Sequence, residues 1–270
     1  MRKHYERPRR ARRAGLPGRR QFLKGAALAG AGLALIPAAP LQAALPLAGV
    51  DGACHESMQD IINTALVAEQ LATTIYYAGL TSRAILLDRR VAGSSANPNR
   101  VARDGNHGNV AYLQAALDQE QKHAQILVKA GAVSPYTHFY FPSSALKKLG
   151  YTSHAGSYLW VLDHLETAFI GAYLVAAQRF GALNHGDLAE LAMRILAVEC
   201  QHRALYRVIS DDDPADNVTL EVADFSCVAD AAAVLEPYLT GHGHGGSAPV
   251  AVPIPTHAQT ARVIGRHTSS

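Results

Sequence analysis

The sequence contains few cysteines and few charged residues. Three cysteines in 270 residues form neither a disulfide-rich scaffold nor a four-cysteine zinc or rubredoxin-type site within one chain. Charged residues make up 17% and hydrophobic residues 49%, which excludes a chain that is disordered throughout. No stretch of alternating apolar and polar residues of any length predicts a β-strand. The length suits one domain of ordinary size with additional segments, or two small domains.

The body of the chain also lacks an excess of basic residues. Residues 1–24 contain ten Lys or Arg and one acidic residue, whereas residues 25–270 contain fifteen basic and twenty-one acidic residues. The overall net charge of +3 therefore comes from the N-terminus. Because the rest of the chain is mildly acidic and has no basic stripe, a nucleic-acid partner is not expected.

Residues 1–43 have the three parts of an export signal: a basic segment, an apolar run and small residues around Ala43 for cleavage. The apolar run is shorter than the roughly 20 residues that span a bilayer, so no stable membrane span is expected after cleavage. Residues 19–24 read Arg-Arg-Gln-Phe-Leu-Lys and resemble a twin-arginine signal. That resemblance implies export of a folded protein by the twin-arginine translocase, to the periplasm or outside the cell. A basic arm on an uncleaved membrane anchor is the alternative.

Four segments of the remaining chain have the periodicity of amphipathic helices, at about residues 56–81, 106–130, 156–180 and 187–209. The last two are joined by a few residues and must be antiparallel neighbours, whereas residues 131–155 are long enough to cross a bundle. The expected domains are the export signal over 1–43, a linker over 44–55, a four-helix bundle over 56–210 and a C-terminal extension over 211–270. The extension is expected to contain one short helix, from Ala229 to Tyr238, and to be mostly disordered elsewhere.

Glutamate is rare in the predicted bundle, and four of the five glutamates between residues 57 and 209 lie on an apolar helix face. Each predicted helix carries one of them: Glu69, Glu120, Glu166 and Glu199. A carboxylate that faces a core costs several kcal/mol unless it is paired or ligates a metal ion. Buried ion pairs are the alternative to a metal site, but the nearby Lys122 and Arg203 lie off the face that carries the glutamates.

Two of these glutamates are followed by a histidine three positions later. His123 follows Glu120 and His202 follows Glu199, and this spacing places both side chains of each pair on one helix face. The order Glu, Glu-x-x-His, Glu, Glu-x-x-His is that of di-iron and di-manganese carboxylate bundles. Four carboxylates and two divalent ions are together neutral, and such a metal pair can share the electrons that reduce O₂ or peroxide.

Over about residues 56–209 the chain resembles the ferritin-like superfamily, and it is most similar to an exported branch with desiccation-related and stress-associated proteins. The best local matches are residues 165–173, 197–203 and 139–142. The resemblance implies an all-α fold, a ferritin-like four-helix bundle with a long crossover between helices two and three. Two features depart from the family pattern, the long connection between helices one and two and the C-terminal extension.

The resemblance also assigns the metal ligands position by position. One metal ion would be held by Glu69, Glu120 and His123. The other would be held by Glu166, Glu199 and His202. Glu120 and Glu199 would bridge the two ions. Iron is the expected metal and manganese the alternative, because both accept these hard ligands.

The favoured function is an exported di-iron carboxylate protein, a ferroxidase or a peroxide- or O₂-linked oxidoreductase in stress defence, with Fe(II), O₂ or H₂O₂ as substrates. The alternatives are a non-catalytic metal-binding or desiccation-protective structural protein and a manganese-catalase-like enzyme. A rubrerythrin-like peroxidase with its own electron-transfer domain is disfavoured because the sequence contains no Cys-x-x-Cys. The sequence allows a homo-oligomer without specifying one.

Several residues keep two interpretations. Tyr76, Tyr173 and Tyr206 lie seven positions after a predicted ligand and either donate hydrogen bonds around the site or simply fill the core. Asp163 is either an additional carboxylate or a surface residue. Cys54 and Cys227 flank the bundle, and in an oxidising compartment they either form a disulfide or stay free.

Overall fold

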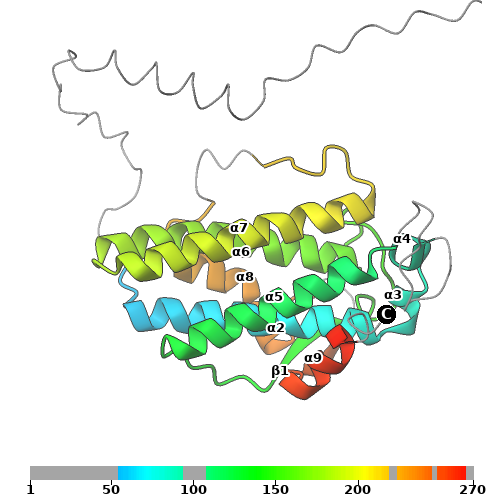
Figure 1. Cartoon of the computed structure of the whole chain (residues 1–270), viewed down its shortest axis with the longest axis horizontal. Coiled ribbons are helices and arrows are strands. Elements are labelled where there is room, and N and C mark those ends of the chain that lie inside the picture. Colours follow the sequence, from blue (N-terminus) through cyan, green and yellow to red (C-terminus); the bar gives the residue numbers. More distant parts are fainter. Residues whose placement is uncertain (1–53, 94–107, 219–223, 245–247, 266–270) are drawn as a thin grey trace, which may run out of the picture. The chain divides into compact units, whose positions relative to one another are not determined.

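The computed structural model describes residues 54–93, 108–218, 224–244 and 248–265. The predicted export signal and all but the end of the predicted linker lie outside these residues. Four long helices, α2 (Met58–Thr81), α5 (Val110–Lys129), α6 (Tyr158–Ala182) and α7 (Gly186–Ser210), run side by side (Figure 1). They confirm the all-α, ferritin-like four-helix bundle, and their ends lie within a few residues of the predicted ones.

The helix directions explain the long crossover in the middle of the chain. Gln59, at the start of α2, donates a hydrogen bond to the carbonyl of Gly131 after α5, so α2 and α5 are antiparallel. Arg179, near the end of α6, donates to the carbonyl of Glu56 before α2, so α2 and α6 are antiparallel as well. Helices α5 and α6 therefore run in the same direction, and residues 130–157 must return along the bundle to connect them.

A local capping signal fixes the start of α2, and a contact with another helix constrains the residues near its end. Ser57 caps its first turn in a capping box, in which the Ser57 hydroxyl accepts from the Asp60 N–H and the Asp60 carboxylate accepts from the Ser57 N–H. At the other end, Gly79 packs directly against the ring of Tyr158 at the start of α6. A β-carbon at Gly79 would lie 2.3 Å from that ring, so only glycine allows this approach.

Short helices occupy the long connection between α2 and α5. Helix α3 (Arg83–Leu86) and helix α4 (Arg89–Ala92) follow α2 directly, and residues 94–107 lie outside the described chain. The N–H of Asn109 donates to the carbonyl of Val91 at 2.7 Å, which ties the start of α5 to α4. The connection thus returns the chain to the bundle end at which α2 finishes.

Helix α6 is the most apolar of the four and contributes many side chains to the core. By length and composition alone it reaches the threshold for a membrane-spanning helix, and among the described residues it is the one helix that does. However, 67% of that apolar window is buried inside the protein. A helix that is hydrophobic nearly all round is typical of a bundle core, because its neighbours cover it on several sides.

The sequence predicts a C-terminal extension that is mostly disordered, and this prediction is wrong for the residues that the structure describes. Helix α8 (Val228–Thr240) matches the predicted short helix. Beyond it, strand β2 (Pro249–Pro253) pairs antiparallel with strand β1 (His138–Pro142) of the crossover, with Tyr140 opposite Ala251. Neither strand was predicted, because each is short and its partner lies far away in the sequence.

The last described helix, α9 (His257–Ile264), packs on α5 and α2 (Figure 1). Two glutamines of α5 hold it: Gln121 donates to the Thr260 hydroxyl at 2.5 Å, and Gln114 donates to the Val263 carbonyl at 2.8 Å. A capping box of Thr256 and Gln259 starts the helix. The described part of the extension therefore belongs to the folded domain, and buried contacts replace the solvation that its Gly- and Pro-rich composition suggested.

Candidate metal centre

Each helix of the bundle places one glutamate in the interior. Glu120 of α5 and Glu199 of α7 are fully buried, and Glu69 of α2 and Glu166 of α6 are 1% exposed. His202 of α7 is 3% exposed and His123 of α5 is 8% exposed. The structure thus brings all six predicted ligands into one interior cluster, as their shared position on the inner helix faces requires.

Within this cluster, the side chains form two groups of metal-ligand type. Ligand atoms of Glu69, Glu120, His123 and Glu199 all lie within 4.8 Å of one another, and so do those of Glu120, Glu166, Glu199 and His202. Glu120 and Glu199 belong to both groups. Two carboxylates shared between two ligand sets, each completed by one carboxylate and one imidazole, suit a pair of neighbouring metal ions.

Both histidines turn the same ring nitrogen toward the carboxylates. His123 Nδ1 lies 3.2 Å from Glu69 Oε2 and 3.2 Å from Glu199 Oε1. His202 Nδ1 lies 2.7 Å from Glu120 Oε1, 3.2 Å from Glu199 Oε2 and 3.7 Å from Glu166 Oε1. Each nitrogen therefore faces several carboxylate oxygens at once, as a ligand of a shared ion would.

The carboxylates are not satisfied by the protein alone. Among the described residues, both oxygens of Glu120, Oε2 of Glu166 and Oε1 of Glu199 are buried and accept no hydrogen bond of good geometry, although imidazole nitrogens lie close to Glu120 Oε1 and Glu199 Oε1. In the same part of the chain no lysine or arginine forms an ion pair with any of the four glutamates, so the imidazoles of His123 and His202 are the cationic groups available to them there. Unpartnered buried carboxylate oxygens are costly, and cations between them would remove that cost.

The protonation of the cluster reflects this crowding. Burial and the neighbouring carboxylates raise the pKa of Glu120 and Glu166 well above the usual range. Burial alone would lower the pKa of His123, but its contacts with Glu199 and Glu69 raise it to about 10. Burial opposes ionisation of Glu199 too, but close contacts with the imidazoles of His123 and His202 hold its pKa below the usual range. Without metal, protons on Glu120, Glu166 and His123 therefore offset part of the negative charge of the cluster.

Two tyrosines connect the halves of the cluster. The Tyr76 hydroxyl of α2 donates to Glu166 Oε1 of α6 at 3.0 Å, and the Tyr173 hydroxyl of α6 donates to Glu69 Oε1 of α2. Both tyrosines therefore donate hydrogen bonds around the site, which is the first of the two roles that the sequence left open for them. Tyr206 simply fills the core, since its buried hydroxyl has no partner among the described residues.

Asp163 belongs to a different polar group. Its carboxylate lies 3.7 Å from Arg203 and 3.7 Å from Arg207, so it pairs with arginines and is not an additional member of the cluster. Arg203 also donates to Thr167 at 2.9 Å and to Asn217 at 2.8 Å. These contacts direct the arginines toward α6 and, for Arg203, toward the segment after α7 rather than toward the four buried glutamates.

Sequence reasoning missed one residue that contacts the cluster. Gln119 of α5 places Oε1 2.8 Å from His202 Nε2, the ring nitrogen that faces away from the carboxylates. A hydrogen bond at this nitrogen fixes the orientation of the ring. Gln119 gave no signal of its own, because it lies beside Glu120 in the sequence and contacts a histidine on another helix.

Comparison with known proteins supports the fold from an independent direction. The family model described as "Ferritin-like domain" matches residues 57–211, which is more than half of the chain and spans all four bundle helices. No curated protein and no solved structure matches the chain.

Proposed function

This chain belongs to the ferritin-like domain family, and we propose that it is a dinuclear metal carboxylate protein. One observation carries the proposal: two buried groups of glutamate and histidine share Glu120 and Glu199. The first ion would be held by Glu69 and His123, the second by Glu166 and His202, and both by the shared glutamates. The unpartnered carboxylate oxygens of the cluster fit this occupancy.

We further propose that the metal is iron and that the protein oxidises Fe(II) or another donor with O₂ or H₂O₂. Carboxylate and imidazole ligands suit iron, and they suit manganese as well. A pair of iron ions supplies redox equivalents to O₂ or peroxide when it is bound. The chain's own contribution is to bury the site, to orient His202 through Gln119, and to hold Glu166 and Glu69 through the hydroxyls of Tyr76 and Tyr173.

The cellular setting is also a proposal and rests on the N-terminal sequence. The twin-arginine pair at residues 19 and 20, the apolar run and the small residues at 43 favour export to the periplasm or beyond. A folded protein that acquires its metal before export would carry it to a compartment where O₂ and peroxide are encountered. A role in stress defence follows from this combination.

The test is an Fe(II) oxidation assay with the purified protein. We expect O₂ or H₂O₂ consumption coupled to Fe(II) oxidation, faster than in buffer and lost in the Glu120→Ala/Glu199→Ala variant. An exposed control, Glu190→Ala on α7, should oxidise Fe(II) like the unmodified protein, because Glu190 lies outside the cluster. Bound manganese with disproportionation of H₂O₂ would favour the manganese-catalase-like alternative. Bound metal with neither activity would favour a structural stress protein and contradict the enzymatic proposal.

A further inference from the structure

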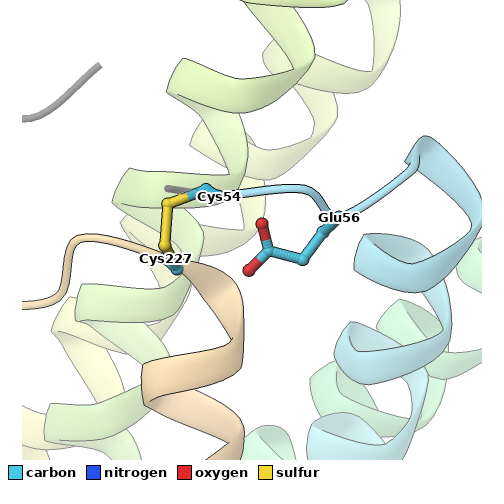
Figure 2. A group of neighbouring side chains, drawn as sticks. All are labelled: Cys54, Glu56 and Cys227. Carbon is cyan, nitrogen blue, oxygen red and sulfur yellow. A yellow bond between two sulfur atoms is a disulfide. The ribbon is translucent and has the colours of Figure 1, made fainter. Parts of the chain in front are cut away.

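A second cluster of metal-ligand side chains lies where the chain enters α2 and where α8 begins. It shares no residue with the buried glutamates. The sulfur atoms of Cys54 and Cys227 form a disulfide, and a carboxylate oxygen of Glu56 lies within 4.8 Å of both. Figure 2 shows the Glu56 carboxylate turned toward the disulfide and the first turn of α8. The disulfide that the sequence left open is therefore present, and a carboxylate accompanies it.

The Glu56 carboxylate is only half satisfied in this arrangement. Oε1 accepts a hydrogen bond from the Ala229 N–H of α8 at 2.9 Å. Oε2 is buried and has no hydrogen-bond partner among the described residues. The nearby Arg179 donates to the backbone carbonyl of Glu56, and no ion pair with the carboxylate is found in that part of the chain. A buried carboxylate oxygen without a hydrogen-bond partner, beside two sulfur atoms, is a group that a bound cation would satisfy.

The surrounding contacts hold the two cysteines together without the sulfur–sulfur bond. The Cys227 N–H donates to Asp230 at 2.9 Å, and Val228 and Leu235 of α8 are buried against the bundle. On the other side, the capping box of Ser57 fixes the start of α2 directly after Glu56. The two Cα atoms, 5.5 Å apart, are thus held by folded elements, so reduction leaves both thiols beside Glu56.

We propose that the reduced protein binds one thiophilic divalent ion through Cys54, Cys227 and Glu56, and that the disulfide closes this site. Two thiolates and a carboxylate are ligands for Zn²⁺, with water at the fourth position. The set is softer than the carboxylates and imidazoles of the buried cluster, so the two places differ in the metals that they select. The site is a redox-controlled metal site, separate from the proposed function.

The chemical steps balance. A reductant such as a phosphine or a dithiol supplies two electrons, the sulfur–sulfur bond breaks, and two protons complete the two thiols. Binding of the ion replaces these two protons with two metal–sulfur bonds and releases the protons to solvent. A small disulfide such as oxidised glutathione then accepts two electrons from the two thiolates and two protons from solvent and leaves as two thiols, while the protein disulfide re-forms and the ion is freed.

The test uses Cd²⁺ with the whole protein, because cadmium–thiolate bonds give an ultraviolet charge-transfer absorbance that carboxylate and imidazole ligands do not give. Reduced and disulfide-bonded protein are titrated in parallel, with a phosphine reductant for the first. We expect one thiolate-bound Cd²⁺ per chain in the reduced protein and none in the disulfide-bonded protein. The third cysteine, Cys200, lies on α7 and is not part of the disulfide. The same titration of the Cys200→Ser variant should be unchanged, which assigns the signal to the other two cysteines.

Two variants separate the ligands. Cys54→Ser should abolish the absorbance, with far-UV circular dichroism as the check of folding. Glu56→Gln keeps the disulfide pair and the side-chain size, and should weaken Cd²⁺ binding by at least about tenfold, the lower bound for groups around a metal site. No cadmium–thiolate absorbance in the reduced protein, the same absorbance in Cys54→Ser, or an unchanged affinity in Glu56→Gln would each overturn the proposal. None of these outcomes depends on the buried cluster.

Discussion

The two halves of the bundle, α2 with α5 and α6 with α7, carry the same pattern of ligands. Each half has a glutamate on its first helix and a Glu-x-x-His on its second. Each also has a tyrosine, seven residues after the first glutamate, that donates to the first glutamate of the other half. If this pattern decided everything, the two proposed metal positions would be equivalent.

The surroundings of the two histidines make them unequal. Gln119 precedes Glu120 and bonds His202, whereas Val198 occupies the corresponding position before Glu199 and has no amide to offer. His202 is also the less exposed of the two rings. Because a fixed imidazole is a better-oriented ligand, we infer that the position with Glu166 and His202 is the tighter one. The ligand pattern would therefore set where ions bind, and the neighbouring side chains would set how tightly.

The largest expected effect comes from removing a shared carboxylate. Glu120→Ala or Glu199→Ala should lose both ions, because each glutamate belongs to both ligand groups. Glu69→Ala and Glu166→Ala should each keep about one ion per chain, since each removes a ligand from one group of a dinuclear site. Elemental analysis of the four purified variants measures this difference. Equal losses in all four would contradict the division into two groups.

The next largest effect is expected from removing the contact between Gln119 and His202. Gln119→Leu should weaken the ion beside His202 by about 10–100-fold and leave the ion beside His123 unchanged. Gln125→Leu, at an exposed position on the same helix, is the matched control. Competitive titration with a metal-sensitive dye resolves the two affinities. If both affinities fell together, or if neither changed, the amide would not distinguish the two positions.

The stability of the metal-free protein should fall as pH rises, whereas the affinity of the protein for metal should increase. In the metal-free protein His123 has a pKa of about 10 against an ordinary value of 6.5, and the pKa values of Glu120 and Glu166 are also raised. The folded state then holds protons that the unfolded chain releases, so stability falls as pH rises from 6.5 toward 10. Metal binding displaces these protons, and affinity should rise about tenfold per pH unit for each proton released.

Thermal unfolding of metal-free and metal-loaded protein between these pH values measures both slopes. The metal-free protein should have its higher Tm at the lower pH, and metal should stabilise more at the higher pH. The same slope in both forms would show that the ions do not occupy the protonated cluster.

The smallest effect concerns the tyrosines that link the halves. Tyr76→Phe and Tyr173→Phe each remove a hydrogen bond to a buried glutamate and should each lower the free energy of unfolding by about 1–2 kcal/mol. Tyr206→Phe is the control, because its buried hydroxyl has no partner among the described residues. Chemical denaturation of the three variants provides the comparison. A larger loss for Tyr206→Phe than for the other two would contradict the assigned roles.

Periodicity was enough to predict the four bundle helices, because burial on one helix face imposes a repeat that is visible locally. The same repeat placed Glu69, Glu120, Glu166 and Glu199 with the two histidines on inner faces, and the structure gathers all six. That they bind metal stays a prediction. Gln119 could not be found in this way, because its contact with His202 joins residues on different helices.

The C-terminal extension is the region whose structure could be predicted least from local sequence patterns. Strand β2 pairs with a partner more than a hundred residues earlier, and no local pattern reveals such a pairing. Helix α9 did have a local signal, the capping box formed by Thr256 and Gln259. The Gly- and Pro-rich composition around this signal favoured a prediction of disorder. In the folded chain, hydrogen bonds from Gln114 and Gln121 hold α9 against α5.

The central claim is that the buried glutamates and histidines hold two metal ions. Its most direct test is the metal content of the full-length protein, isolated from its native compartment, beside that of the Glu120→Ala/Glu199→Ala variant. We expect about two ions of iron or manganese per chain, as in dinuclear carboxylate bundles, and their loss in the variant. The absence of stoichiometric metal, together with unchanged folding of the variant, would contradict it.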